Sequence, residues 1–177
     1  MANIQEKIAK LFPEATFEDG EILLVNIPDA KWHQLAKCLK EDAELHFDHL
    51  VTIVGMDWTD KLGCVYYLNS TKHNTSLSVK VTTDDREKPM IHSVHDVWKI
   101  ATTFEREVYD FFGIIFINNP DMRRLFLSID WKGYPLRKDY DMNPDVNPVS
   151  LENERQEDTT VSYVEKEDGT IEKKVVE

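Results

Sequence analysis

The stretch 104-FEREVYDFFGIIFINNPDMRRLF-126 carries an unusual combination of charged and aromatic side chains. Glu105, Arg106, Glu107 and Asp110 lie within six positions and are followed by an apolar run and an Asn-Pro turn. A helix buried in a core carries less charge than this, and a solvated helix carries less aromatic surface. The stretch is therefore either an active site or a surface on which another protein packs.

Outward from this stretch, the spacing of apolar residues predicts an α+β fold. Helices are predicted at about residues 3–12, from residue 28, and from about residue 94 to residue 112. Gly113 follows the last of these, where a left-handed C-cap is favoured. Runs rich in β-formers predict strands at 16–19, 21–27, 50–58, 61–70, 75–83 and 114–117. The sequence thus predicts a small mixed sheet with helices packed on it, followed by an extended C-terminal tail.

Three regions are predicted along the chain of 177 residues. Residues 1–117 form the α+β body, residues 118–141 form a loop region with a basic patch, and residues 142–177 form an extended acidic tail. Near the end, the run VSYV-EKEDGT-IEKKVV predicts a hairpin around Asp168-Gly169. Since nothing in the predicted body needs this hairpin, it is either loose or paired with the sheet edge of a neighbouring protein.

Composition and charge bound the possible functions. The apolar share of 41% and charged share of 31% are typical of a soluble globular protein, and no window resembles a membrane span. The N-terminus has no signal or transit character, which predicts a cytoplasmic location. The net charge of -12 argues against nucleic-acid binding, which depends on cationic side chains. The charge is uneven, because residues 139–177 hold twelve Asp/Glu and four Lys/Arg, and this tail is either solvated or docked on a partner.

The sequence offers few tools for chemistry of its own. The six glycines are isolated, which argues against a nucleotide-binding loop, and two separate cysteines cannot hold an iron–sulfur cluster. The His pairs at 46/49 and 92/95 are interpreted as ordinary surface or capping residues rather than metal ligands. Glu105 and Glu107 are two apart on one helix and point to different faces, so they do not form a catalytic dyad. We therefore expect no catalytic, metal-binding or cofactor-binding residue in this chain.

The charged stretch is better interpreted as architecture and interface. Arginine suits buried, bidentate pairing with carboxylates, and aromatic residues and arginine are enriched at interface hot spots. We expect arginines to tie the third helix, the turn and the tail together through nearby acids, or to reach a partner. The arginines in this prediction are Arg106, Arg123, Arg124 and Arg137, and the acids are Glu105, Glu107, Asp110 and Asp139.

Two blocks of the sequence resemble the signature of the thirty-kilodalton subunit family of respiratory complex I, the NADH:quinone oxidoreductase, which is also called its C-type subunit. The first block is EREVYDFFGIIF followed by NPDMRRLF, and the second is DWKGYPLRKDY. Together the match covers about residues 45–141. One position departs, because Asn119 stands where the family usually has His or Lys. The structural or interface residues implied are Glu105, Arg106, Glu107, Asp110, Gly113, Asp121, Arg123, Arg124, Trp131, Gly133, Pro135, Arg137, Lys138, Asp139 and Tyr140.

The resemblance implies a non-catalytic scaffold subunit in the peripheral arm of this proton-translocating complex. It implies packing against the D-type subunit, the forty-nine-kilodalton type, and against the B-type subunit. It also implies that iron–sulfur clusters, FMN, NADH and quinone belong to the assembled complex and not to this chain. The expected location is the cytoplasmic side of the bacterial inner membrane, with membrane contact only through the complex.

Two alternatives stay open from the sequence. One is the equivalent subunit of a membrane-bound [NiFe] hydrogenase or a ferredoxin-linked complex, which shares ancestry with complex I. The other is a free-standing enzyme with a site built from Glu105, Glu107 and Arg124, which predicts activity of the isolated chain.

Overall fold

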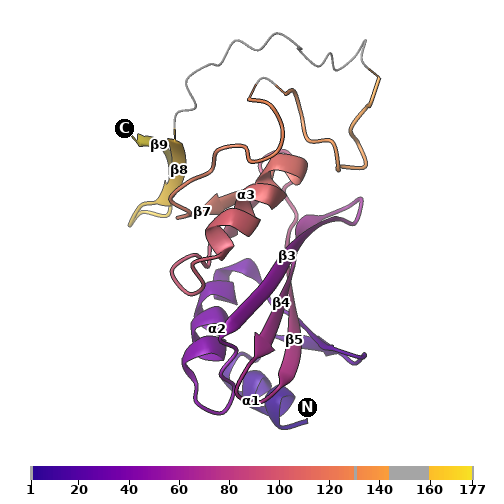
Figure 1. Ribbon diagram of the computed structural model, residues 1–177, viewed down its shortest axis with the longest axis vertical. Coiled ribbons are helices and arrows are strands. Elements are labelled where there is room, and N and C mark those ends of the chain that lie inside the picture. The colour runs from indigo at the N-terminus through magenta and orange to yellow at the C-terminus, as the bar shows by residue number, and fades with distance from the viewer. Residues whose placement is uncertain (1, 130, 144–159, 177) are drawn as a thin grey trace.

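The fold is α+β, as predicted, and is built on one mixed sheet (Figure 1). The computed structural model describes residues 2–129, 131–143 and 160–176. The sheet has the strand order β1-β2-β5-β4-β3, in which β2 and β5 are parallel and the other neighbours are antiparallel. Its elements, with the two helices of the first part of the chain, are α1 (Ala2–Leu11), β1 (Thr16–Glu18), β2 (Leu23–Asn26), α2 (Asp29–Glu41), β3 (His49–Asp57), β4 (Leu62–Ser70) and β5 (Thr75–Thr83).

Alternation along the strands gives the sheet one buried face. On β4, Leu62, Cys64, Tyr66 and Leu68 point into the core, whereas the side chain of Tyr67 is exposed. Helix α2 covers this face with its stripe of Trp32, Leu35, Ala36 and Leu39, all fully buried. The ring of Trp32 lies 4.4 Å from that of Tyr66, so α2 is fixed against the middle of the sheet.

The second part of the chain adds a smaller parallel pair and a third helix. Its elements are β6 (Met90–His92), α3 (Ala101–Phe112) and β7 (Ile115–Ile117), and β6 pairs with β7. Helix α3 packs on β3, and an atom added at Gly55 of β3 would meet the ring of Phe112. The charged and aromatic stretch that begins at residue 104 therefore lies, with helix α3, across one end of the main sheet (Figure 1).

The predicted start of the third helix was wrong by about seven residues. Helix α3 begins at Ala101, and residues 94–100 form turns instead. The backbone N–H of Val94 donates to the Glu105 carboxylate at 2.9 Å. A continuous helix from residue 94 would separate these two positions by about 16 Å, at about 1.5 Å per residue. The chain turns back here because it folds onto the side chain of Glu105.

The C-terminal hairpin is formed by β8 (Thr160–Glu165) and β9 (Ile171–Val176), with the turn at Asp168-Gly169. The prediction that the body has no need of it was wrong, because it docks on its own chain. The N–H of Asn118 donates to the Tyr163 carbonyl at 2.6 Å, and the N–H of Met122 donates to the Val161 carbonyl at 2.7 Å. Of the predicted acidic tail, residues 144–159 lie outside the described residues.

A charged contact joins this hairpin to the body. The His92 ring lies between the carboxylates of Asp29, at 2.6 Å, and Glu165, at 3.1 Å. The hydrogen bond with Asp29 contributes most to raising the pKa of His92, to about 9. His92 is therefore charged at neutral pH, and its contribution to stability is lost as the pH rises from the unfolded value of 6.5 through about 9.

None of the helices among the described residues is long and apolar enough to cross a membrane.

Gly113 gives a test of how the end of α3 is built. It adopts φ 72°, and an added Cβ would overlap the ring of Tyr134. We expect Gly113→Ala to lower the free energy of unfolding by roughly 2–4 kcal/mol, from backbone strain and overpacking together. Gly169→Ala is the matched control, since Gly169 has φ 80° but no atom near the added methyl. Equal losses in urea unfolding would show that the Tyr134 contact adjusts without cost.

Candidate subunit interface

The signature segment, residues 104–140, is held to the body by buried carboxylates. Glu105 is fully buried on α3. Its Oε2 accepts hydrogen bonds from Ser93 Oγ at 2.6 Å and Asn119 Nδ2 at 2.7 Å, and its Oε1 accepts one from the Val94 N–H at 2.9 Å. One carboxylate thus joins α3 to the turn before it and to the Asn-Pro turn after it.

The environment of Glu105 favours its protonated form. Burial raises the pKa of Glu105 to about 7, and the bonds from Ser93, Val94 and Asn119 only partly oppose this rise. All three donors are neutral, and among the described residues Glu105 is not paired with any of the arginines expected to tie the segment together. Asn119 fills the position where the family usually has His or Lys, and it supplies an uncharged amide to the carboxylate.

Asp110 is the second buried carboxylate of α3, and it shapes the loop after the Asn-Pro turn. Its Oδ2 accepts the backbone N–H groups of Leu125, Phe126 and Leu127 at 2.7–3.1 Å. Its Oδ1 accepts a hydrogen bond from Arg124 Nη1 at 2.9 Å. Three consecutive amides around one carboxylate form a cradle for the anion, so the path of residues 125–127 is fixed by Asp110.

Arg124 connects this cradle to the second block of the signature. Its Nη1 also donates to the Asp110 carbonyl at 3.1 Å, while its Nη2 donates to the carbonyls of Trp131 and Gly133 at 3.0 and 3.1 Å. The guanidinium lies 5.4 Å from the centre of the Tyr134 ring. Five-donor, planar geometry lets one arginine satisfy all these acceptors, which a lysine could not do.

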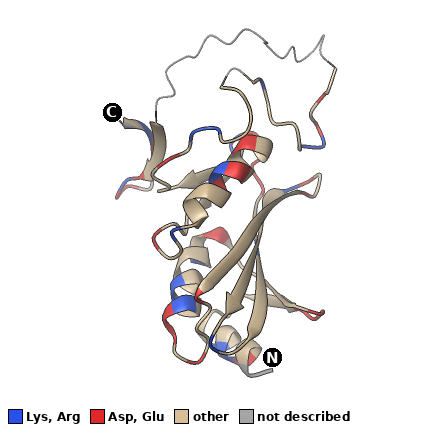
Figure 2. Cartoon of the chain, viewed as in Figure 1, with Lys and Arg blue, Asp and Glu red and all other residues tan. Residues whose placement is uncertain are grey.

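Arg106 and Arg123 are used inside the segment in a similar way. Arg106 donates to the carbonyls of Arg123 and Arg124 at 3.0 Å each and lies 3.3 Å from the Asp121 carboxylate. Arg123 pairs with the same carboxylate at 2.8 Å. The hydrogen bonds from Arg123 contribute most to lowering the pKa of Asp121. In Figure 2, charged positions mark α3 and the loop that carries these arginines beside it.

A second cluster anchors the last part of the segment to the main sheet. Arg86 binds Asp57 in a bidentate manner at 2.7 and 3.0 Å and reaches Asp139 at 3.0 Å. The N–H of Lys138 donates to Asp57 at 2.9 Å, and Arg137 donates to the Arg86 carbonyl. The pairing with Arg86 holds the pKa of Asp57 well below its usual range. Sequence reasoning missed Asp57 and Arg86, although both lie within residues 45–141, the range over which the chain resembles the family.

Tyr140 packs against the rest of the second signature block and holds its turn at residues 132–133 in place. Gly133 adopts φ 77°, and a Cβ there would meet the Tyr140 ring at 2.7 Å. The Tyr140 hydroxyl donates to the Lys132 carbonyl at 3.2 Å. Trp131 and Pro135 are half-buried beside them.

Glu107 differs from the other charged residues of the signature. It is half-buried, and within the described ranges its side chain makes no hydrogen bond or ion pair. Of the two expected roles for the signature charges, Glu107 does not tie the segment together within the described residues, where the nearby arginines are engaged by Asp110 and Asp121. That Glu107 reaches a partner stays a prediction.

Apolar side chains project from the framework that these charges build. The exposed fractions are 64% for Phe126, 44% for Ile129, 55% for Leu136 and 69% for Met142. The Phe126 ring also stacks on Phe111 of α3, with centroids 5.8 Å apart. The arrangement can hold a protein partner, since rigid aromatic groups are presented at low entropic cost.

The described residues offer little for metal or covalent chemistry. No group of three or more His, Cys, Asp or Glu side chains among them could hold a metal ion. Burial raises the pKa of the Cys64 thiol well above its usual value and also raises the pKa of Cys38, which disfavours a reactive thiolate at either position.

These features define a class: an α+β protein in which most charged residues of the signature bond within the chain and shape its own loops, while several apolar side chains beside them are exposed. The chain belongs to the 30 kDa subunit family of the respiratory-chain NADH dehydrogenase. The family described as "Respiratory-chain NADH dehydrogenase, 30 Kd subunit" matches residues 25–146. The resemblance seen in the two sequence blocks is thereby confirmed.

Similar proteins carry consistent names. The chain is 48% identical over 149 residues to the C/D subunit of the NADH-quinone oxidoreductase of Phocaeicola vulgatus, covering 83% of this chain and 28% of that protein. It is 35% identical to the C-type subunit of the same kind of enzyme in Cupriavidus pinatubonensis, covering 76% of this chain and 70% of that protein. The chain therefore spans only about a quarter of the first relative but most of the second.

The fold is also similar to a chain in the structure of the membrane-bound sulfane sulfur reductase, an archaeal respiratory membrane complex. The TM-score is 0.70 at 26% identity, and the match covers 90% of this chain and 98% of that one.

The raised pKa of Glu105 predicts a pH-dependent stability. Since the folded state binds the proton more tightly than the unfolded chain, with its value of 4.5, stability falls as the pH rises from about 4.5 through about 7. This contribution is on the order of 3 kcal/mol. We expect Glu105→Gln to remove the fall in stability between pH 5 and 6.5 in urea unfolding, below the range in which His92 contributes. Because the Gln side-chain N–H faces a donor, the variant should also be less stable overall. Glu107→Gln is the control, and an unchanged slope in Glu105→Gln would contradict the assignment.

Arg124 predicts a large loss of stability on truncation. Arg124→Ala leaves the fully buried Asp110 carboxylate without its cation and strands the carbonyls of Trp131 and Gly133. We expect the free energy of unfolding to fall by about 3–5 kcal/mol. Lys132→Ala, at an exposed neighbouring cation, should change it by less than about 0.5 kcal/mol. A loss below about 1 kcal/mol for Arg124→Ala would show that water replaces the pair.

Proposed function

We propose that this chain is a non-catalytic scaffold subunit in the peripheral arm of a proton-translocating NADH:quinone oxidoreductase. It supports electron transfer from NADH to quinone by holding the redox subunits in place. The proposal rests on one observation, that charged and apolar side chains of the signature segment have different surroundings. Its charges bond to one another and to the backbone, as at Asp110 and Arg124, while Phe126 and its apolar neighbours face outward.

The partners proposed are the D-type (forty-nine-kilodalton) subunit and the B-type subunit, through the apolar surface of residues 126–142. The name of the Phocaeicola vulgatus relative, which joins C and D in one subunit, supports a close association of the two types. Glu107, half-buried and without a partner in the described part of this chain, is the charged residue proposed to pair across that interface. Iron–sulfur clusters, FMN, NADH and quinone are proposed to lie in the other subunits.

The proposed location follows from this assembly. The chain is placed on the cytoplasmic side of a bacterial inner membrane as a peripheral protein, and it contacts the membrane only through the complex. Nucleic acid is not a proposed partner, since the net charge is -12.

A second candidate has support from the fold comparison. The likeness to a chain of an archaeal sulfane sulfur reductase complex favours, as the alternative, the equivalent subunit of a related membrane-bound complex of the [NiFe] hydrogenase or ferredoxin-linked type. The tagged chain, purified from membranes in mild detergent, separates the two. Co-purification of a flavin-bearing NADH module supports the first, and a nickel hydrogenase subunit or absence of the flavin module supports the second.

The scaffold role itself is tested by Phe126→Ser. Since Phe126 is 64% exposed, the variant should fold, whereas loss of a central interface aromatic typically costs at least about 2 kcal/mol of binding. We expect the amount of assembled complex to fall by about tenfold or more, with NADH:quinone turnover per assembled complex near normal. Leu11→Ser, at a 51% exposed residue of α1, is the control. Full assembly with lost turnover would overturn the scaffold role.

A further inference from the structure

The face of the main sheet that points away from α2 carries a stripe of partly exposed apolar side chains among polar ones. Strand register pairs Val54 of β3 with Val65 of β4. On the same face, Ser78 of β5 lies between its two neighbours, Tyr67 of β4 and Leu24 of β2. The exposed fractions are 39% for Val54 and 36% for Tyr67. A sheet face in water normally alternates to polar side chains, so this stripe is suited to being covered.

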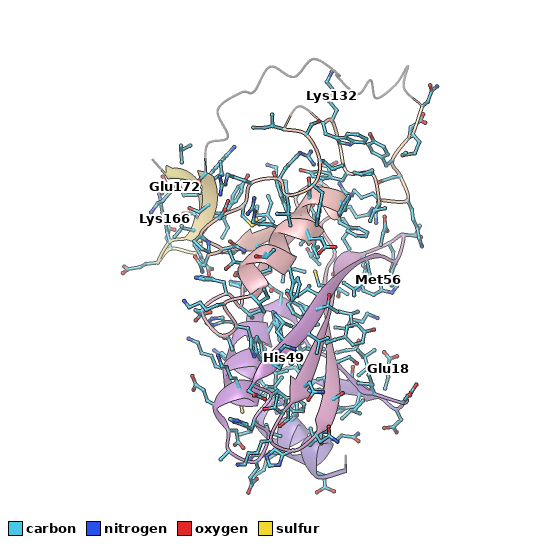
Figure 3. The ribbon with its side chains drawn as sticks, viewed as in Figure 1. Glu18, His49, Met56, Lys132, Lys166 and Glu172 are labelled. Atoms are coloured by element: carbon cyan, nitrogen blue, oxygen red, sulfur yellow. The ribbon has the colours of Figure 1, made fainter. Side chains whose placement is uncertain are left out.

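Leu24, Val65 and Tyr67 of this stripe line the floor of a groove with a volume of about 540 Å³. Met56, with an exposed fraction of 37%, and Trp58 continue the apolar floor. In Figure 3, Met56 and Glu18 lie on the same side of the sheet, away from the helices α1 and α2. This groove is separate from the signature segment, none of whose residues lines it.

The rim of the groove is acidic. Glu18, Asp19 and Glu21, on and beside the β1–β2 turn, line it along one side. Glu18 accepts a hydrogen bond from Asn26, and the side chains of Asp19 and Glu21 are exposed. The cation in the groove, Lys80, lies 4.6 Å over the ring of Trp58 and does not pair with these acids.

We propose that this groove binds a basic amphipathic helix of another subunit in the assembly. The floor fits an apolar stripe, and the three acids fit Lys or Arg side chains at the margin of that helix. The four spacings between five strands, at about 4.8 Å each, span roughly 19 Å, which a helix of about 13 residues crosses. A second copy of this acidic chain would bring like charge to the rim, so it is the less complementary occupant.

This groove is an additional binding site, and its proposal rests on the proposed function in one respect, that the chain is part of a multi-subunit complex. It is tested with a photo-reactive benzoylphenylalanine in place of Tyr67, introduced into the tagged chain and irradiated in the purified complex. We expect a cross-link to a peptide of another subunit in which apolar residues are flanked by Lys or Arg. The same label at Leu11, an exposed residue of α1, is the control.

Charge reversal makes the test specific. The double change Asp19→Lys with Glu21→Lys should reduce the cross-link from position 67 at least about fivefold. The double change Glu41→Lys with Glu167→Lys, at exposed acids outside the groove, should leave it unchanged. A cross-link yield from position 67 that is no higher than the yield from position 11 would overturn the proposal. So would a cross-link to an acidic peptide or to a second copy of this chain. The third contrary result is a cross-link yield that does not change in the Asp19→Lys, Glu21→Lys variant. Recovery of the other subunits in the same sample checks the assembly separately.

Discussion

The contact between Asp110 and Arg124 is the interaction on which the signature segment depends. Asp110 is fully buried, so its charge needs compensation, and it finds this in one guanidinium and three backbone amides. Arg124 in turn donates hydrogen bonds to the carbonyls of Trp131 and Gly133 in the second signature block. Without this pair the loop after the Asn-Pro turn would have no fixed path, and Phe126 would not be held outward.

Glu105 solves a different problem with neutral groups. Its carboxylate receives a hydroxyl, an amide and a backbone N–H, so desolvation is opposed by hydrogen bonds but by no countercharge. Burial raises the pKa of this carboxyl group to about 7, and the hydrogen bonds from Ser93, Val94 and Asn119 only partly oppose the rise. Through Glu105, α3 is joined to the turn at Ser93 and Val94 and to the Asn-Pro turn at Asn119. Helix α3, which also carries Asp110, packs on strand β3 of the main sheet.

Much of the architecture could be predicted from local pattern. The β-formers in residues 61–70 predicted the strand that became β4, and the apolar spacing after residue 28 predicted helix α2. The start of α3 could not be predicted, because the backbone N–H of Val94 bonds to the side chain of Glu105, eleven residues further along the chain. The docking of the C-terminal hairpin was missed as well, since the backbone bonds to Asn118 and Met122 join segments about forty residues apart.

The sequence by itself determined the family and the α+β class, since two ordered motifs and strong periodicity are local information. Only the tertiary structure decided which charges face inward. Asp57 and Arg86 anchor the signature to the sheet, whereas Glu107 finds no partner in the described chain. The physical reason is that an ion pair depends on a distance of a few ångströms between side chains, and sequence spacing does not fix that distance across separate elements.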